Sequence, residues 1–132
     1  MTTSTDIAIV GWAQTPLVLH TEQSETQMLL HVITDALTPL GLTRADIDFT
    51  CLGSCDYITG QAFSFVSNLD AIGAWPPKRD SHVEMAGASA LYAAWPRLQE
   101  GDIEIAVVTG SCRAPTGDPP LISPLERHPP FP

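Results

Sequence analysis

The segment from residue 82 to residue 110 constrains the fold of this chain most strongly, because a short strand-like stretch and an apolar run enclose a helix of small residues. The expected helix, 86–99, begins with Gly87, Ala88, Ser89 and Ala90. A helix with so few bulky side chains can lie close to other backbones in a crowded interior. The runs around 82–84 and 105–109 are typical of short strands. The segment therefore predicts strand, closely packed helix and strand, in the order of an α/β fold.

The first half of the chain repeats this alternation. Residues 7–11 form an apolar run that ends in glycine, which predicts a strand buried on both faces. From residue 25 the apolar residues recur at spacings of three and four, which predicts a helix capped by Ser24 and ended near Pro39 and Gly41. A capped turn at 43–48 and a second strand at 49–53 follow. Strand, helix and strand in this order favour a parallel sheet.

Two later stretches carry weaker patterns. Between residues 54 and 79, six apolar residues could share one helical face, and we interpret this stretch as a helix or as a segment that contacts a partner. These residues are Phe63, Phe65, Val66, Leu69, Ile72 and Trp75. Seven prolines follow Cys112. We therefore expect a domain over 1–112 and an extended, poorly packed proline-rich tail over 113–132.

Composition excludes several classes of partner. The 132 residues include 15 acidic and 6 basic ones, and the net charge of -9 disfavours nucleic acid and anionic membranes as partners. No uninterrupted apolar run is long enough for a membrane span, and the first six residues do not resemble a signal peptide. Three cysteines, an odd number, favour a reducing compartment. We therefore expect a cytoplasmic protein.

His82 and Glu84 are the candidate catalytic residues. Glu84 precedes the small-residue helix, where the helix N-terminus favours negative charge. Its carboxylate could act as a general base or an orienting group, or it could have the structural role of accepting from the backbone N–H groups of the helix. His82 lies two residues earlier, so in a strand both side chains project to the same face and could pair. A structural role for His82 stays open as well.

The other residues that could be reactive or could bind a metal or phosphate do not form recognisable sites. Three residues separate Cys51 from Cys55, there is no second pair, and the histidines at 20, 31 and 128 are scattered, so we expect no metal site. Cys112 follows the last expected strand in acidic surroundings that disfavour a thiolate. The glycines do not form a phosphate-binding pattern. We therefore expect no tightly bound cofactor.

The sequence resembles the amino-terminal part of the thiolase superfamily, in its lipid-transfer and sterol-carrier branch. Five residues match the nucleophile motif and the segment after it, namely Gly87, Ala90, Leu91, Gly101 and Ala106, while residues 7–16, 57–65 and 81–110 extend the resemblance. Glu84 stands where the family has its nucleophilic cysteine. The resemblance implies a partial three-layer α/β fold, the amino-terminal part of the first half, with a mixed, mostly parallel sheet and a buried central helix.

The resemblance also implies a function. Family members act on coenzyme A thioesters, as acetyl-CoA acetyltransferases or, in some relatives, as enzymes that cleave sterol-CoA esters by retro-aldol chemistry. A carboxylate is a far poorer acyl acceptor than a thiolate, so Glu84 disfavours cysteine-type acyl transfer. The family's carboxy-terminal histidine and second cysteine have no counterparts here. The chain is then expected to handle acyl-CoA or sterol-CoA esters only with additional polypeptide.

Two other interpretations remain open, and each has consequences for partners. The chain could be a noncatalytic thiolase-fold binding or assembly subunit, or an unrelated small α/β domain. The resemblance implies a homo-oligomer or a complementary thiolase-like chain, and a small partner with an OB-fold and a zinc ribbon. Because helices of this kind are enclosed on both sides in the family, we expect an isolated chain to expose apolar surface and to self-associate.

Overall fold

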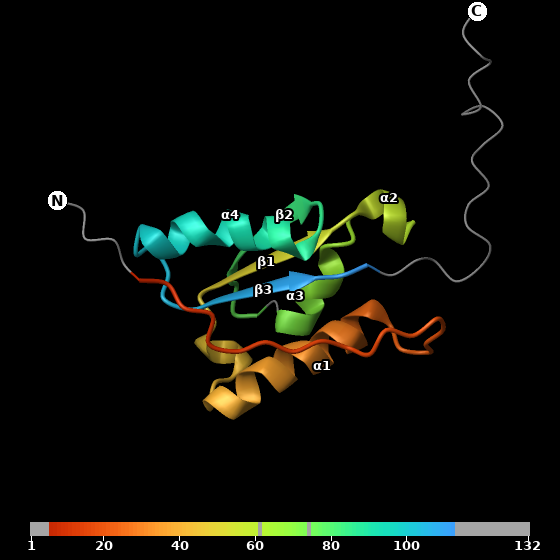
Figure 1. Cartoon of the computed structure of the whole chain (residues 1–132), viewed down its shortest axis with the longest axis horizontal. Coiled ribbons are helices and arrows are strands. Elements are labelled where there is room, and N and C mark those ends of the chain that lie inside the picture. The colour runs from red at the N-terminus through yellow and green to blue at the C-terminus, as the bar shows by residue number, and fades with distance from the viewer. Residues whose placement is uncertain (1–5, 61, 74, 113–132) are drawn as a thin grey trace, which may run out of the picture.

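The computed structural model describes residues 6–60, 62–73 and 75–112. A three-stranded parallel sheet in the order β2-β1-β3 lies between helix α4 on one side and helices α1 and α3 on the other (Figure 1). The strands are β1 (Phe49–Ser54), β2 (Arg79–Glu84) and β3 (Ala106–Gly110). The helices are α1 (Glu25–Leu37), α2 (Asp56–Thr59), α3 (Val66–Ile72) and α4 (Gly87–Gln99). The predicted α/β class is confirmed, and all three strands in the described ranges run parallel.

Strand register brings the carboxyl ends of the three strands to one edge of the sheet. Ser54 of β1 is paired with Glu84 of β2, and Gly53 is paired with Gly110 of β3. Parallel α/β sheets place ligands at this edge, because the loops that follow the strands gather there. His82 and Glu84 therefore lie where the fold concentrates functional groups.

Helix α1 follows its sequence signals closely. Ser24 and Gln27 form a capping box, in which the Ser24 side chain accepts from the Gln27 N–H and the Gln27 side chain accepts from the Ser24 N–H. A short 3-10 turn, Thr38–Leu40, and Gly41 with φ 69° end the helix as predicted. The apolar face packs Leu29, Ile33 and Leu37 against Ile47, Ala71 and Ile72. This cluster forms one half of the core.

Helix α4 forms the other half of the core, but only one of its faces is covered. Ala90 and Ala94 are fully buried against Phe49, Cys51 and Ile103. Tyr92 on α4 is 80% exposed, and Leu91 and Trp95 are also exposed. The expectation of a buried central helix is therefore wrong, because no layer formed by the described residues covers the outer face.

Three glycines bring α4 against the carboxyl ends of the strands. A Cβ added to Gly53 would lie 2.5 Å from the carbonyl oxygen of Ala86, and one added to Gly87 would lie 3.0 Å from the Cα of Gly110. The first distance is shorter than real Cβ contacts, and the second is a tight contact that the neighbouring backbone would have to relieve by a small shift. The small residues at these positions thus allow the connection from β2 to α4 to cross directly over the sheet edge.

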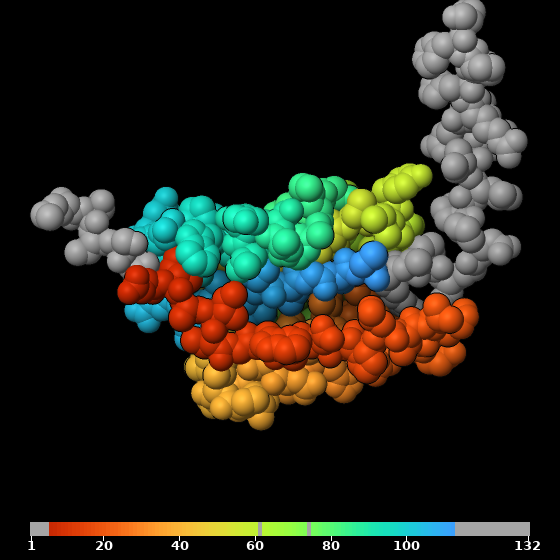
Figure 2. Space-filling model, in the orientation of Figure 1, coloured from red at the N-terminus to blue at the C-terminus, as the bar shows by residue number. Residues whose placement is uncertain are grey.

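Residues 7–11 are not a strand, which corrects the prediction of a buried strand there. The segment runs along α1 on the surface, and Ile9 and Val10 are 72% and 67% exposed (Figure 2). Gly11 lies against α1, since a Cβ there would be 3.0 Å from the carbonyl oxygen of Ala36. A strand needs a neighbour for its backbone hydrogen bonds, and no described strand lies beside this run.

The stretch between β1 and β2 is helical only in part. Helix α3 buries Asn68, Ala71 and Ile72, whereas Phe63 is 68% exposed and Trp75 is 85% exposed. The predicted helical face over 63–75 is therefore wrong at both ends. The predicted tail, 113–132, lies outside the described residues. Within the described ranges, no helix is long and apolar enough to cross a membrane.

Candidate functional site

Five polar side chains meet at the carboxyl edge of the sheet. His82 and Glu84 lie on the same side of β2 as predicted, and His82 Nε2 is 3.7 Å from Glu84 Oε2. Ser54 ends β1, and its buried Oγ lies 2.9 Å from His82 Nε2 and 2.6 Å from Ser64 Oγ. Asp56, at the start of α2, completes the group. We call Ser54, Asp56, Ser64, His82 and Glu84 the edge cluster.

Asp56 anchors one end of the edge cluster as a carboxylate. Its Oδ1 accepts from Ser64 Oγ at 2.7 Å and from Ser64 N at 3.0 Å, while its Oδ2 accepts from Phe63 N at 2.7 Å. The hydrogen bond from the Ser64 side chain, followed by those from the two backbone N–H groups, lowers the pKa of Asp56. The Asp56 side chain is therefore ionised at neutral pH.

Because the ionised Asp56 can only accept hydrogen bonds, it sets the direction of the hydrogen bonds in the edge cluster. A hydroxyl carries one proton, and Ser64 donates its proton to Asp56. Ser64 Oγ must then accept from the Ser54 hydroxyl, and Ser54 Oγ must accept from His82 Nε2. His82 thus carries a proton on Nε2 in this arrangement. It cannot at the same time remove the proton of Ser54, so the geometry excludes a serine nucleophile activated by His82.

The same contacts exclude a Ser-His-carboxylate triad. In a triad the serine and the carboxylate contact different ring nitrogens of the histidine. Here Ser54 and Glu84 both lie nearest Nε2. The edge cluster is instead a hydrogen-bonded chain from Asp56 to His82 with a second carboxylate at its open end.

Glu84 is held by a backbone group of another element. Its Oε1 accepts from Asp56 N at 2.5 Å, and its side chain is 51% exposed. Helix α4 begins at Gly87, and its N-cap Ala86 has no side-chain hydrogen bond. The interpretation that Glu84 satisfies the N–H groups of α4 is therefore wrong, because β2 continues through Glu84 and directs the carboxylate toward α2. Its Oε2 faces His82.

Asp56, His82 and Glu84 could hold a metal ion. Each residue offers one ligand atom, and these atoms all lie within 4.8 Å of one another. The sequence does not predict this group, because Asp56 comes from another segment and no spacing links it to His82 and Glu84. The available signal was the position of all three residues at the ends of consecutive parallel strands.

A second polar network lies beneath the edge cluster. The buried Asn68 side chain donates to Thr50 Oγ1 at 3.1 Å and accepts from Thr109 Oγ1 at 2.8 Å. The buried Glu25 accepts from Ser67 Oγ and from Ser111 Oγ. These contacts join α1 and α3 to β1 and to the end of β3.

The three cysteines are unpaired and have no common site. Cys51 is fully buried in the core, and burial raises the pKa of its thiol. Cys55 is partly buried, and Cys112 is exposed. A raised pKa disfavours the thiolate that nucleophilic chemistry needs, so Cys51 is a core residue.

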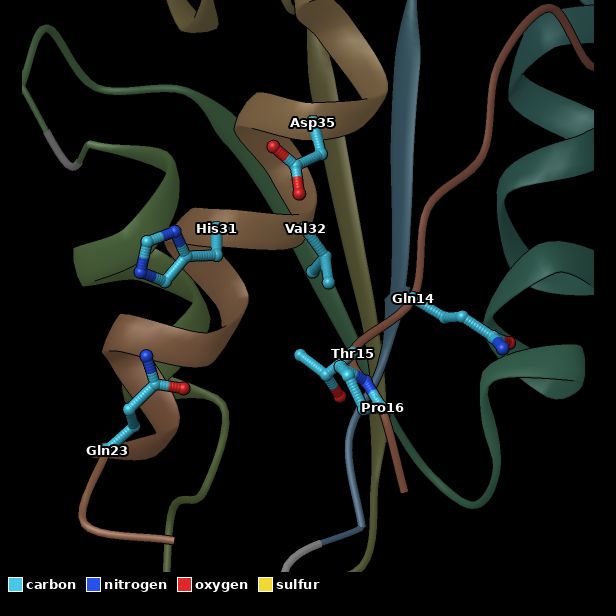
Figure 3. A pocket seen from close by; sticks show the side chains of 7 residues that line it. All are labelled: Gln14, Thr15, Pro16, Gln23, His31, Val32 and Asp35. Carbon is cyan, nitrogen blue, oxygen red and sulfur yellow. The ribbon is translucent and has the colours of Figure 1, made fainter. Parts of the chain in front are cut away.

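A shallow hollow of about 260 Å³ lies elsewhere on the molecule, between the amino-terminal segment and α1. Figure 3 shows Thr15 and Pro16 facing Val32 of α1, whereas Gln14 extends away from that helix. Gln23, His31 and Asp35 complete the lining. The hollow includes no member of the edge cluster and has no buried charged side chain.

Comparisons with known protein families, with curated proteins and with solved structures found no match to this chain. The thiolase resemblance therefore stays a prediction, and the edge cluster is the structural feature that bears on function.

Proposed function

We propose that the edge cluster performs acid–base chemistry on an acyl-CoA or sterol-CoA ester, as part of a thiolase-like lipid-transfer protein. The observation that carries the proposal is the hydrogen-bonded chain from Asp56 through Ser64 and Ser54 to His82 Nε2, with the Glu84 carboxylate 3.7 Å from that nitrogen. The half-exposed Glu84 carboxylate, held beside a fixed imidazole at the open end of this chain, can accept a proton from a ligand and return it.

Of the two reactions implied by the resemblance, retro-aldol cleavage suits these residues better than acyl transfer. Acyl transfer needs a nucleophile, and Glu84 is a poor one toward a thioester. In retro-aldol cleavage of a 3-hydroxyacyl-CoA, Glu84 would take the proton of the 3-hydroxyl group. The bond between C2 and C3 would break, giving a carbonyl product, which is a ketone where C3 carries two carbon substituents, and the enolate of the shortened thioester. Protonated Glu84 would then return its proton to C2.

In this proposal, a second polypeptide completes the catalytic cycle. The outer face of α4 and the segment 9–19 expose large apolar side chains, which supports a homo-oligomer or a complementary thiolase-like chain as partner. The exposed residues of the segment are Ile9, Val10, Trp12, Leu17, Val18 and Leu19. The same surface favours the second candidate function, a noncatalytic thiolase-fold binding or assembly subunit.

A binding experiment separates the two candidates. We expect a 3-hydroxyacyl-CoA to bind the chain more tightly than the matching acyl-CoA without the hydroxyl, because Glu84 accepts the extra hydrogen bond. NMR titration should place the amide shifts at Ser54, Asp56 and Glu84. Glu84→Gln, which loses the charge, should reduce the preference several-fold, since hydrogen bonds to charged groups are about twice as strong as neutral ones.

Glu104→Gln is the matched control, because Glu104 is an exposed acidic residue just before the amino end of β3, away from the carboxyl edge. It should leave the preference unchanged. Equal binding of the two esters, or shifts confined to other parts of the chain, would refute the acid–base proposal and favour the assembly subunit. Incubation with acetyl-CoA should give no acyl adduct on any cysteine by mass spectrometry.

A further inference from the structure

We infer that Asp56, His82 and Glu84 form a binding site for a divalent transition-metal ion of the Zn²⁺ type. The donor set is one imidazole nitrogen and two carboxylate oxygens, which zinc accepts in protein sites. Metal–ligand bonds of about 2.0–2.2 Å place ligand atoms roughly 3–4.4 Å apart. The three ligand atoms already lie within 4.8 Å of one another, so small side-chain movements bring them to bonding distance.

Charge around the three residues favours a cation. Two carboxylates from different elements meet here, and none of the four lysines and arginines in the described ranges is placed to neutralise them. Arg44 donates to the carbonyl oxygen of Ala71, and Lys78 donates to that of Ile47. Arg79 and Arg97 both pair with Asp102. A divalent ion would supply the positive charge that the two carboxylates lack, because the four basic side chains have other partners.

The surrounding contacts fix the ligands and leave the site open. Glu84 Oε1 is held by Asp56 N–H, which leaves Glu84 Oε2 for the ion. Asp56 Oδ1 accepts two hydrogen bonds from Ser64 and Oδ2 accepts one from Phe63 N, so Oδ2 keeps a lone pair for the ion. The His82 ring packs against Phe65, with centroids 5.5 Å apart. Such outer contacts orient metal ligands. The side chains of His82 and Glu84 are 20% and 51% exposed, so the ion has a path from solvent and room for water ligands.

Metal binding requires His82 to change its tautomer. When the ion occupies Nε2, the proton of that nitrogen moves to Nδ1 through solvent, so the ring stays neutral and Ser54 loses one donor. The ion also engages Glu84. Bound metal and proton transfer by Glu84 therefore exclude each other, and the ion would inhibit the proposed acid–base chemistry. The site itself rests on the donor geometry and does not depend on the proposed function.

The test uses the full 132-residue chain with Zn²⁺ in titration calorimetry and Co²⁺ as an optical probe. We expect one ion per chain. Glu84→Gln and His82→Gln should each weaken binding at least tenfold. Glu84→Gln retains a carbonyl oxygen for the Asp56 N–H, and circular dichroism shows whether each variant keeps its fold. His31→Ala and Glu104→Gln are matched controls on other surfaces and should bind as the wild type does.

Two results would overturn the inference. One is the absence of saturable Zn²⁺ binding, or binding that neither edge-cluster variant weakens. The other is a thiolate-to-cobalt charge-transfer band, which would place the ion on Cys55 or Cys112. Because no CoA ester enters this experiment, its failure is distinct from failure of the acid–base proposal.

Discussion

Substitution of Gly53 by alanine tests whether α4 enters the fold across the sheet edge as described. A Cβ at this position would lie 2.5 Å from the carbonyl oxygen of Ala86, 2.6 Å from its carbonyl carbon and 2.8 Å from the Cα of Gly87. All three atoms belong to the backbone, so no side-chain rotation can relieve the contact. The connection from β2 to α4 must move by roughly 0.9 Å to reach ordinary contact distances.

Two effects of Gly53→Ala oppose each other. Replacing a glycine inside a strand restricts the unfolded chain and favours folding by about 0.5–1 kcal/mol. Overpacking of a close contact costs about 1–3 kcal/mol. Because the obstructing atoms are backbone, we expect the second effect to dominate and the free energy of unfolding to fall by about 1–2 kcal/mol.

Equilibrium unfolding in urea, followed by circular dichroism, measures this loss. With a slope of about 2 kcal/mol per molar urea, the midpoint should fall by roughly 0.5–1 M. NMR should show shifted amide resonances at Ser54, Asp56 and Ala86. Gly41→Ala is the control, since Gly41 has φ 69° but no atom within 4 Å of an added Cβ, so it strains the backbone without moving the edge cluster. A Gly53→Ala chain as stable as the wild type, with unmoved amides, would refute the reasoning.

Three further predictions concern the core, acid stability and association. Asn68→Ala should lower the free energy of unfolding by about 1–3 kcal/mol, because it leaves the buried Thr50 and Thr109 hydroxyls without a partner; chemical denaturation measures it, and an unchanged midpoint would contradict it. Hydrogen bonds from the Ile105 and Glu104 N–H groups lower the pKa of Asp48, so its stabilisation is present above the unfolded value near 3.8 and is lost as pH falls through the lower folded value. Asp48→Asn should therefore destabilise the chain at pH 7 and lose less stability than the wild type on acidification, whereas parallel pH profiles would disprove this linkage. The exposed apolar residues of segment 9–19 predict self-association, and a compact monomer in light scattering would count against it.

Local chemistry made much of the fold predictable. The capping box at Ser24, the left-handed Gly41 and the apolar spacing of α1 all act within a few residues, so the sequence reveals them directly. The same holds for β1, β3 and the start of α4. Periodicity failed at residues 7–11, since an apolar run becomes a strand only when another strand supplies its hydrogen bonds. It also failed to show that α4 has an uncovered face.

The candidate site was predictable only in part. Alternation along a strand was enough to place His82 and Glu84 on one side of β2. Asp56 and Ser64 were missed, because a β1–β2 crossover brings them to the edge and no local spacing records that contact. The proton on His82 Nε2 follows only from the chain of donors that begins at Asp56.

The sequence by itself determined the α/β alternation, the capped helix α1 and the closely packed start of α4, because short-range sterics and hydrogen bonds specify them. Only the tertiary structure decided what Glu84 does. The parallel register of β1 and β2 sets it opposite Ser54 and within reach of the Asp56 N–H, so the carboxylate joins His82 at the sheet edge instead of capping α4. Such a role depends on residues 28 positions apart in sequence, and only folding brings them together.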